Sequence, residues 1–392
     1  MADRLFVPFC DYVIRRYKNA SMLPPHNVMD RRLHSGEIRI TLTAKTPVMI
    51  GRRTPGKNQA VTFLRNADGC PIIPGSSLRG LVRQNMQILG FSLVRVGKND
   101  EIADVRSKYN IDLSQGLPEA HGRVSPTEDV LDYANSILGF VGRQRKEGWK
   151  KIQDCYRSRV SFGDLAAPQN ARECRPTPLT AYSPPDYIRN RDEKGGFTLP
   201  GTRQYPLMEP VPSPRNRNER QIQPLDRGTQ FSGTIRYRNL HSDELGLLLW
   251  CLRLEKDCFH TMGMGKPYGY GRMALEINEL VEYDFDQLYS SFATAPAPRS
   301  DPHQRVDELI TCYQDYALSQ PGVKKLGDSL LDIPHIRQFF SLKRLPVKAS
   351  DPPRAAVSNK ELRKQAKKAA PQASTGEVND WKAQLSNKFK SN

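Results

Sequence analysis

Hydrophobic and polar residues alternate along residues 37–50, which read EIRITLTAKTPVMI. Ile38, Ile40 and Leu42 are separated by arginine and threonine, and this period of two predicts a β-strand with one buried face. Gly51 ends the pattern. Similar alternation predicts a strand over 229–240, and SRVSFGDLA predicts a short strand over 158–166. A last strand is expected after the glycine-rich part of residues 261–280.

Two other stretches follow the helical period. Between about 77 and 90 one stripe is apolar, formed by Leu78, Leu81, Val82, Met86 and Leu89. A serine oxygen can accept from the free amides of a first turn, so Gly75-Ser76-Ser77 is expected to cap this helix. Residues 242–255 predict a second helix, capped by Ser242 with Glu244 in its first turn. The predicted order is therefore strand, helix, strands, helix, strand.

The patterned region is flanked and interrupted by segments without clear periodicity. We expect an N-terminal arm over 1–35, a core over 36–285, a C-terminal extension over 286–342 and a basic tail over 343–392. Insertions are expected at about 91–135 and 168–226, the second being rich in proline, arginine and asparagine. The tail holds 12 Lys+Arg against 4 Asp+Glu, which predicts a largely disordered or marginally helical segment.

The net charge indicates what kind of partner the protein binds. The chain of 392 residues carries a formal net charge of +17 and has a pI of about 9.6, which favours a polyanionic partner, RNA or DNA before a membrane. No run of 18 apolar residues predicts a membrane span. The charged N-terminus does not fit a secretory signal. The seven cysteines form no CxxC pair and indicate reduced thiols in the cytoplasm.

The run PIIPGSSLRGLVR, residues 71–83, is a first candidate for anion binding. The free amides and the positive end of the helix attract phosphate, and nearby hydroxyls and arginines can complete the contact. The side chains in question are Ser76, Ser77, Arg79 and Arg83. The alternative is a capped core helix with solvated arginines.

The run GMGKPYGYGR, residues 263–272, is the second candidate. Its glycines allow positive φ and a close approach of backbone amides to a ligand. Its charged and aromatic residues suit a polyanion that carries bases. The members are Gly263, Gly265, Lys266, Tyr268, Gly269, Tyr270, Gly271 and Arg272. The run is neither a Walker loop nor a dinucleotide fingerprint. The alternative is a glycine hairpin between packed elements.

The two runs together resemble the RAMP superfamily of CRISPR-associated proteins. HSGEIRITLTAKTPVMIG (34–51), SRVSFGDL (158–165) and LPGTRQYP (199–206) look like further blocks of this family, in the same order. The resemblance covers about residues 34–280. It is greatest to the backbone subunits of type III effectors, and among them to D-subtype members with a large insertion. It implies an α+β fold with a ferredoxin-like, RRM-related βαββαβ core and large insertions.

The resemblance also implies a function. Family members hold guide-RNA (crRNA) phosphates with the helix that opens after IPGSS and with the glycine loop, beside other effector subunits and the complementary target RNA. These roles carry over to the residues of the two runs. Further basic residues near the first strand and in RQRKEGWKK are candidate RNA contacts: Arg52, Arg53, Lys57, Arg143, Arg145 and Lys146. No cofactor is expected for RNA binding.

Two enzymatic alternatives remain open. Backbone subunits often cut target RNA with an aspartate in the loop after the first strand, typically with Mg²⁺. Here that loop, GRRTPGKNQA, contains no acid, and the weak substitutes are Asp68 and Asp30. A metal-independent RAMP ribonuclease that matures the guide would need a histidine base, for which His26 and His34 are candidates. The sequence favours a protein that does not cleave.

The sequence gives less support to three further interpretations. Cys251, Cys258, His260 and His241 are zinc-ligand types without a zinc spacing, and Cys251 is expected to pack in the apolar face of its helix. A general RNA-binding sheet would need aromatic residues on a central strand, which IRYRNL does not supply. A scaffold protein whose charge only serves solubility would not explain the two linked runs.

Overall fold

The computed structural model describes the chain with gaps. The described residues are 6–18, 20–51, 60–94, 131–147, 150–180, 201–205, 207–213, 219–290 and 302–344. Within them no helix is both long and apolar enough to cross a membrane. The predicted contacts Arg52, Arg53 and Lys57, and the tail from residue 345, lie outside the described residues.

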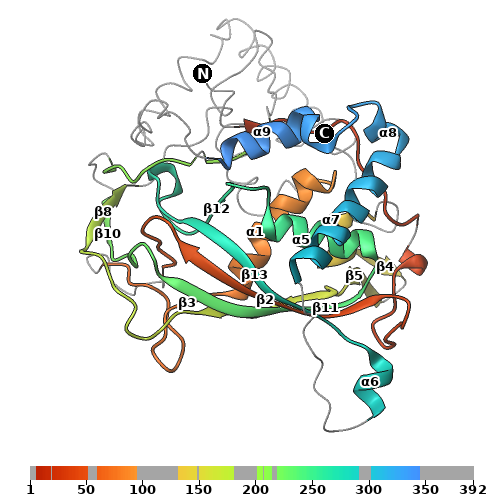
Figure 1. The fold of residues 1–392 in the computed structure, drawn as a ribbon, viewed down its shortest axis with the longest axis horizontal. Helices are drawn as coiled ribbons and strands as arrows, with labels where there is room; N and C mark the ends of the chain where they lie inside the picture. Colours follow the sequence, from red (N-terminus) through yellow and green to blue (C-terminus); the bar gives the residue numbers. More distant parts are fainter. Residues whose placement is uncertain are drawn as a thin grey trace, which may run out of the picture.

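The centre of the molecule is an antiparallel sheet (Figure 1). Its three long strands are β2 (His34–Ala44), β11 (Gln230–Leu240) and β13 (Arg272–Glu282). β2 pairs with β13 on one side and with β11 on the other. Beyond β11 lie the short strands β6 (Val160–Phe162) and β7 (Leu165–Ala166), and then β3 (Ile72–Ile73).

This order confirms the predicted α+β fold. Taking β2, β6/β7, β11 and β13 as strands one to four, the spatial order is four-one-three-two, with helices after the first and third strands. That is the ferredoxin-like βαββαβ arrangement. β12 (His260–Thr261) extends the sheet beyond β13. The first strand ends at Ala44 and not at residue 50, because residues 45–51 leave the ladder in irregular backbone.

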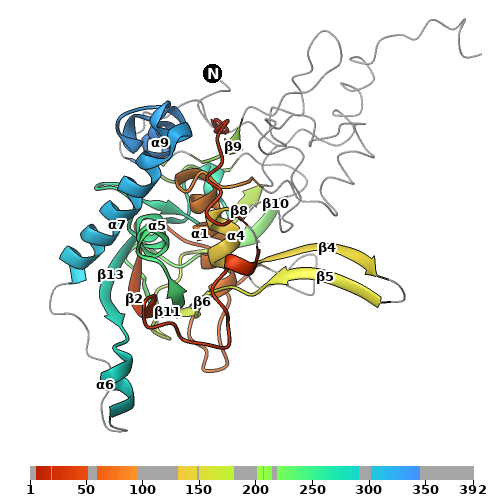
Figure 2. The ribbon, with the colours of Figure 1, turned by 90° about the vertical axis from the view of Figure 1, so that its right-hand side faces the viewer.

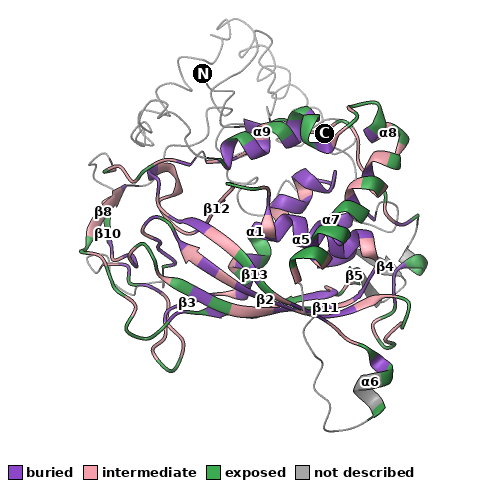
Figure 3. Cartoon of the chain, viewed as in Figure 1, coloured by how far each residue is buried: buried purple, intermediate pink, exposed green. Residues whose placement is uncertain are grey.

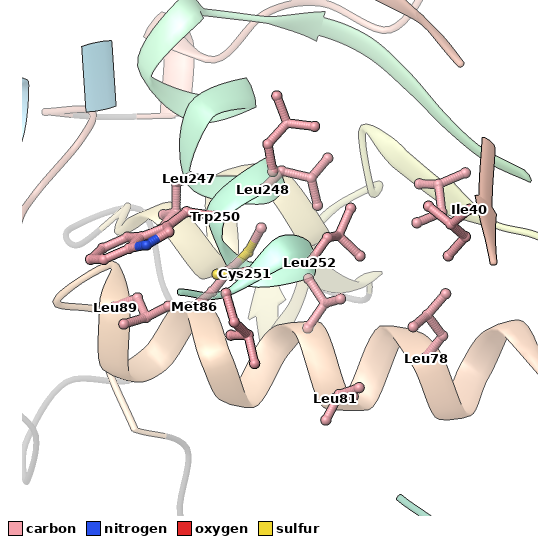
Figure 4. Packing of buried hydrophobic residues seen from close by; sticks show 14 of the residues in the cluster. Ile40, Leu78, Leu81, Met86, Leu89, Leu247, Leu248, Trp250, Cys251 and Leu252 are labelled. Carbon is pink, nitrogen blue, oxygen red and sulfur yellow. The ribbon is translucent and has the colours of Figure 1, made fainter. Parts of the chain in front are cut away.

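Two helices cover one face of the sheet. α1 (Gly75–Leu89) and α5 (Ser242–Arg253) follow the predicted apolar stripes. Their side chains interlock between the helices and β2, where the sheet contributes Ile40 (Figure 4). The α1 and α5 members of this contact include Leu78, Leu81, Met86, Leu89, Leu247, Leu248, Trp250, Cys251 and Leu252. Each such side chain contributes about 1.5–3 kcal/mol when fully buried.

The helices from residue 302 onward belong to the same hydrophobic core. α7 (Pro302–Ser319) packs along α5, and α9 (Pro334–Leu342) lies across the end of α1. α6 (Phe285–Ser290) precedes them, and α8 (Pro321–Lys324) and η6 (Leu330–Asp332) connect them. Residues 302–342 therefore close the core on the helical side of the sheet.

The other face of the sheet carries no helix within the described residues (Figure 3). It is polar and paired with itself: Arg39 meets Glu279 at 2.7 Å, and Thr41 Oγ1 lies 3.1 Å from Ser232 Oγ. The outward positions of β2 and β11 carry no aromatic side chain. The face therefore does not supply the stacking platform of a general RNA-binding sheet.

A long two-stranded hairpin leaves the body of the molecule (Figure 2). It consists of β4 (Phe140–Glu147) and β5 (Lys150–Tyr156), and it follows the short helix α4 (Tyr133–Leu138). The sequence predicted neither strand. The remaining elements are β1 (Phe6–Val7), η2 (Ala20–Met22), β8 (Thr177–Thr180), β9 (Thr202–Arg203), β10 (Glu219–Ile222) and η5 (Lys266–Tyr268). β1 pairs with β9, and β8 pairs with β10.

Candidate nucleic-acid interface

The start of α1 is capped by a carboxylate and not by a serine. Pro74 is the residue before the helix, and the amide of Gly75 donates to Asp164 Oδ1 at 2.8 Å. Ser76 is exposed, and neither Ser76 nor Ser77 caps the helix, so the predicted serine cap is wrong. Asp164 follows β6, so the sheet itself delivers the charge that stabilises this helix end.

The two arginines of α1 hold the end of α4. Arg83 Nη2 donates to the carbonyl of Gly139 at 2.8 Å and to that of Leu138 at 3.3 Å, and Arg79 donates to Leu138 as well. Cationic donors suit the free carbonyls at a helix C-terminus. The hairpin begins at Phe140, directly after these carbonyls. Phosphate contact by Arg79 and Arg83 stays a prediction, and the structure gives both an anchoring role at the hairpin base.

The hairpin base is also braced by the N-terminal arm. Phe140 packs with Tyr17, and Tyr156, on the facing strand, lies against them. Tyr156 OH donates to the carbonyl of Pro24 at 2.9 Å. The strands beyond this base carry Arg143, Arg145, Lys146, Lys150 and Lys151 against Glu147 and Asp154. A basic hairpin thus projects from a firmly held base.

The second predicted run forms a loop between β12 and β13, as expected. Its four glycines all have positive φ: Gly263 at 82°, Gly265 at 76°, Gly269 at 84° and Gly271 at 74°. A Cβ would lie 2.4 Å from the Met49 carbonyl at Gly263 and 2.6 Å from the Glu209 carbonyl at Gly269. The glycines therefore let the loop pack against its own chain on both sides.

The loop carries two kinds of side chain: tyrosines that pack against the protein, and the cations Lys266 and Arg272. Tyr268 is buried and Tyr270 is half-buried, so Tyr268 is an apolar anchor. Lys266 Nζ lies 5.7 Å from the centre of the Tyr205 ring, and burial lowers the pKa of this lysine. Arg272 is buried and donates to Glu209 Oε1 at 3.0 Å.

The two predicted runs do not meet. Gly75 packs against Phe162, which pairs through Ile235 to Ile38 on β2. The glycine loop lies past Ala44, at the far end of the same strand. Six residues of strand correspond to about 20 Å. They are therefore separate positions along one side of the sheet and do not form a single pocket.

The two weak aspartate candidates have different local surroundings. Asp68 lies in the exposed turn between Asn66 and Cys70. Asp30 pairs with Arg32 at 2.8 Å, and hydrogen bonds from Arg32 lower its pKa to about 2. The described residues contain no group of three histidine, cysteine or acidic side chains that could hold a metal ion.

The two histidine candidates have structural partners. His34 joins Glu282 and Ser242, with its ring nitrogens 2.9 Å from each, at the end of β2 opposite to the glycine loop. Ser242 therefore does not cap α5; the residue before the helix is His241, whose amide donates to Glu244. His26 lies on the Tyr156 ring, 4.7 Å between centres, and burial lowers its pKa.

Three of the residues considered as zinc ligands have structural positions. Cys251 is buried in the apolar face of α5, as predicted. His260 is buried and its Nε2 lies 2.6 Å from the carbonyl of Leu252. His241 sits at the start of α5.

Comparisons with known proteins identify the family of this chain. The family model of the RAMP superfamily matches residues 41–274, and the chain belongs to this superfamily. A solved structure, that of Thermofilum pendens Csc2, is similar with a TM-score of 0.35 and 17% identity, over 82% of this chain and 93% of that chain. No curated protein matches the sequence.

Proposed function

We propose that the chain is a guide-RNA-binding backbone subunit of a type III CRISPR effector, a ribonucleoprotein of antiviral defence in the cytoplasm. The observation that carries the proposal is a RAMP core with a projecting basic hairpin. The glycine loop supplies further cations, Lys266 and Arg272. Basic side chains favour contacts to phosphate and ribose, which position an RNA strand without reading its sequence.

The proposed subunit holds RNA and does not cut it. No carboxylate lies in the sequence of the loop after β2, Asp68 lies in an exposed turn, and Asp30 pairs with Arg32. Other effector subunits and the complementary target RNA are its proposed partners. If one target cut made by the purified complex in Mg²⁺ vanished in Asp68→Ala or Asp30→Ala, a cleaving role would replace this one.

Removing the charge of the hairpin tests RNA binding. In the triple variant Arg143→Ala, Arg145→Ala and Lys146→Ala we expect weaker binding of single-stranded RNA and a smaller slope of log K against log salt. Each lost phosphate contact lowers that slope by about 0.7. The measurement is fluorescence anisotropy over a range of salt concentrations, with melting temperature as a check on folding.

A matched control removes the same charge elsewhere. Lys324, Lys325 and Arg337 are exposed on or beside α8 and α9, away from the hairpin. Replacing all three by alanine lowers net charge equally, so it reports the non-specific part of the effect. Equal losses in both triple variants would contradict a specific role of the hairpin.

A further inference from the structure

A lysine at the end of α9 is buried beside the glycine loop. Lys343 is 1% exposed, and its one hydrogen-bond acceptor within the described residues is Thr261 Oγ1, at 3.1 Å. Its carbonyl accepts from the amide of Phe259 at 2.8 Å, which joins the end of α9 to the segment leading into β12. A buried ammonium without a carboxylate partner is costly, so this position requires an explanation.

A second cation lies on the same side of the strands. Thr261 and Arg272 are paired across β12 and β13, which places their side chains next to each other on one face of the sheet. Arg272 Cζ lies 6.0 Å from the centre of the Phe259 ring. Its Nε and Nη1 are buried and find no hydrogen-bond partner among the described residues. Lys343 and Arg272 thus flank Thr261 and Phe259, and two donors of Arg272 have no partner among the described residues. Lys343 Nζ also lies 5.6 Å from the centre of the Phe339 ring.

Lys266 is the third cation of this group. Its charge is close enough to lower the pKa of Lys343, after burial, which is the larger cause. The one carboxylate on these cations within the described residues is that of Glu209, bound to Arg272. The Glu209 side chain is 67% exposed, so the group opens to solvent where Glu209 meets Arg272. Three cations against one displaceable carboxylate leave a net positive site.

We propose that Lys343, Arg272 and Lys266 form a phosphate site for the bound RNA strand, in which the phosphate takes the place of Glu209 on Arg272. The site rests on the proposed RNA-binding function and adds to it a residue outside the matched RAMP region. The segment that ends α9 thereby becomes part of the RNA interface and not only a cover for the core.

The site also makes RNA binding depend on pH. Burial, followed by the charge of Lys266, lowers the pKa of Lys343 to about 7. A phosphate favours the charged ammonium, so binding is tightest below this pKa and weakens as the pH rises through it, by at most about tenfold per pH unit. His260, with a pKa lowered to about 4, and Cys258, with a raised pKa, keep their charge in this range. Lys266, Arg272 and the neighbouring Arg344 remain in every Lys343 variant.

The test compares Lys343→Met with wild type by anisotropy of a labelled single-stranded oligouridylate between about pH 6 and 8.5. We expect Lys343→Met to bind about tenfold or more weakly at the acidic end, the value for a lost charged hydrogen bond, and to lose the extra weakening at alkaline pH. The control is Lys324→Met, which replaces an exposed lysine on α8. This variant should keep the wild-type affinity at acidic pH and the weakening at alkaline pH.

A second variant, Glu209→Gln, is expected to change the RNA affinity in the opposite direction to Lys343→Met. We expect tighter binding of the oligouridylate, because the competing negative charge is removed while one hydrogen bond to Arg272 can remain. This variant also tests the site if Lys343→Met fails to fold. Glu209→Gln binding no tighter than wild type would count against the proposal.

The outcomes separate the two proposals. If wild type binds no RNA, the proposed function fails and this site fails with it. If wild type binds and a folded Lys343→Met variant matches it in affinity and pH dependence, the phosphate site is wrong while the proposed function stands.

Discussion

Replacing Arg159 by methionine is expected to lower the free energy of unfolding by about 3–5 kcal/mol, the usual cost of breaking a buried ion pair from one side. Arg159 and Glu244 are 3% and 0% exposed. Arg159 Nη1 donates to Glu244 Oε2 at 2.7 Å, and a second bond joins Nη2 to Oε1. Tyr17 OH also donates to this carboxylate, at 2.9 Å. The variant would leave a buried carboxylate without its cation.

Urea unfolding followed by circular dichroism measures this change. Arg39→Met is the matched control, since Arg39 pairs with Glu279 on the open face and its side chain is 53% exposed. Its cost should be about 1 kcal/mol or less. Equal costs for the two variants would contradict the account of the buried pair.

The same pair predicts how stability responds to acid. Burial alone would raise the pKa of Glu244, but the charge and hydrogen bonds of Arg159 outweigh it and lower the pKa to about 2, below the ordinary value of 4.5. Stability from this group is therefore fully present above about pH 4.5 and is lost as the pH falls toward 2. In Arg159→Met this acid-dependent component should shrink. An unchanged acid dependence in the variant would point to other carboxylates.

Gly271→Ala is expected to cost about 3 kcal/mol or more and to weaken RNA binding. Gly271 has a φ of 74°, and a Cβ there would lie 1.9 Å from the Met262 carbonyl. The strain of a left-handed residue is about 1–2 kcal/mol, and displacing the loop also loses buried backbone bonds at about 1–3 kcal/mol each. The bonds at risk are Met262 N to Gly271 O, at 2.9 Å, and Gly271 N to Pro47 O, at 2.8 Å.

Two other glycines serve as controls for the separate causes. Gly228 has a φ of 84° but nothing within 4 Å of a Cβ, so Gly228→Ala should show the backbone strain alone. Gly80 lies on the exposed side of α1 with open space around it, and Gly80→Ala should stabilise the protein by about 0.5–1 kcal/mol. If Gly271→Ala were no worse than Gly228→Ala, the close packing of the loop would be wrong.

The sequence predicted the elements whose periodicity is long and unbroken. β11, α1 and α5 were each placed within two residues at either end, because an amphipathic stripe and a buried core face agree there. The stripe of α7 was equally readable: Val306, Leu309, Ile310 and Tyr313 follow the helical period and are buried. It was not predicted because most other positions of this helix are polar or charged.

Other features depended on residues far apart in the chain. The cap of α1 comes from Asp164, 89 residues after Gly75, and no local pattern shows it. The β4–β5 hairpin has few apolar residues beyond its base because it projects from the core, so it lacks the alternation of a half-buried strand. Lys343 looked like the start of a basic tail, and only the fold brings it to Thr261.

The most direct test of the central claim is to purify the protein with its bound RNA, cross-link it with ultraviolet light and map the cross-linked peptides by mass spectrometry. The account predicts a guide RNA in the preparation and cross-links in the hairpin, residues 140–156, and in the glycine loop, residues 261–272. Cross-links confined to the open face of β2 and β11, or a preparation free of RNA, would contradict it.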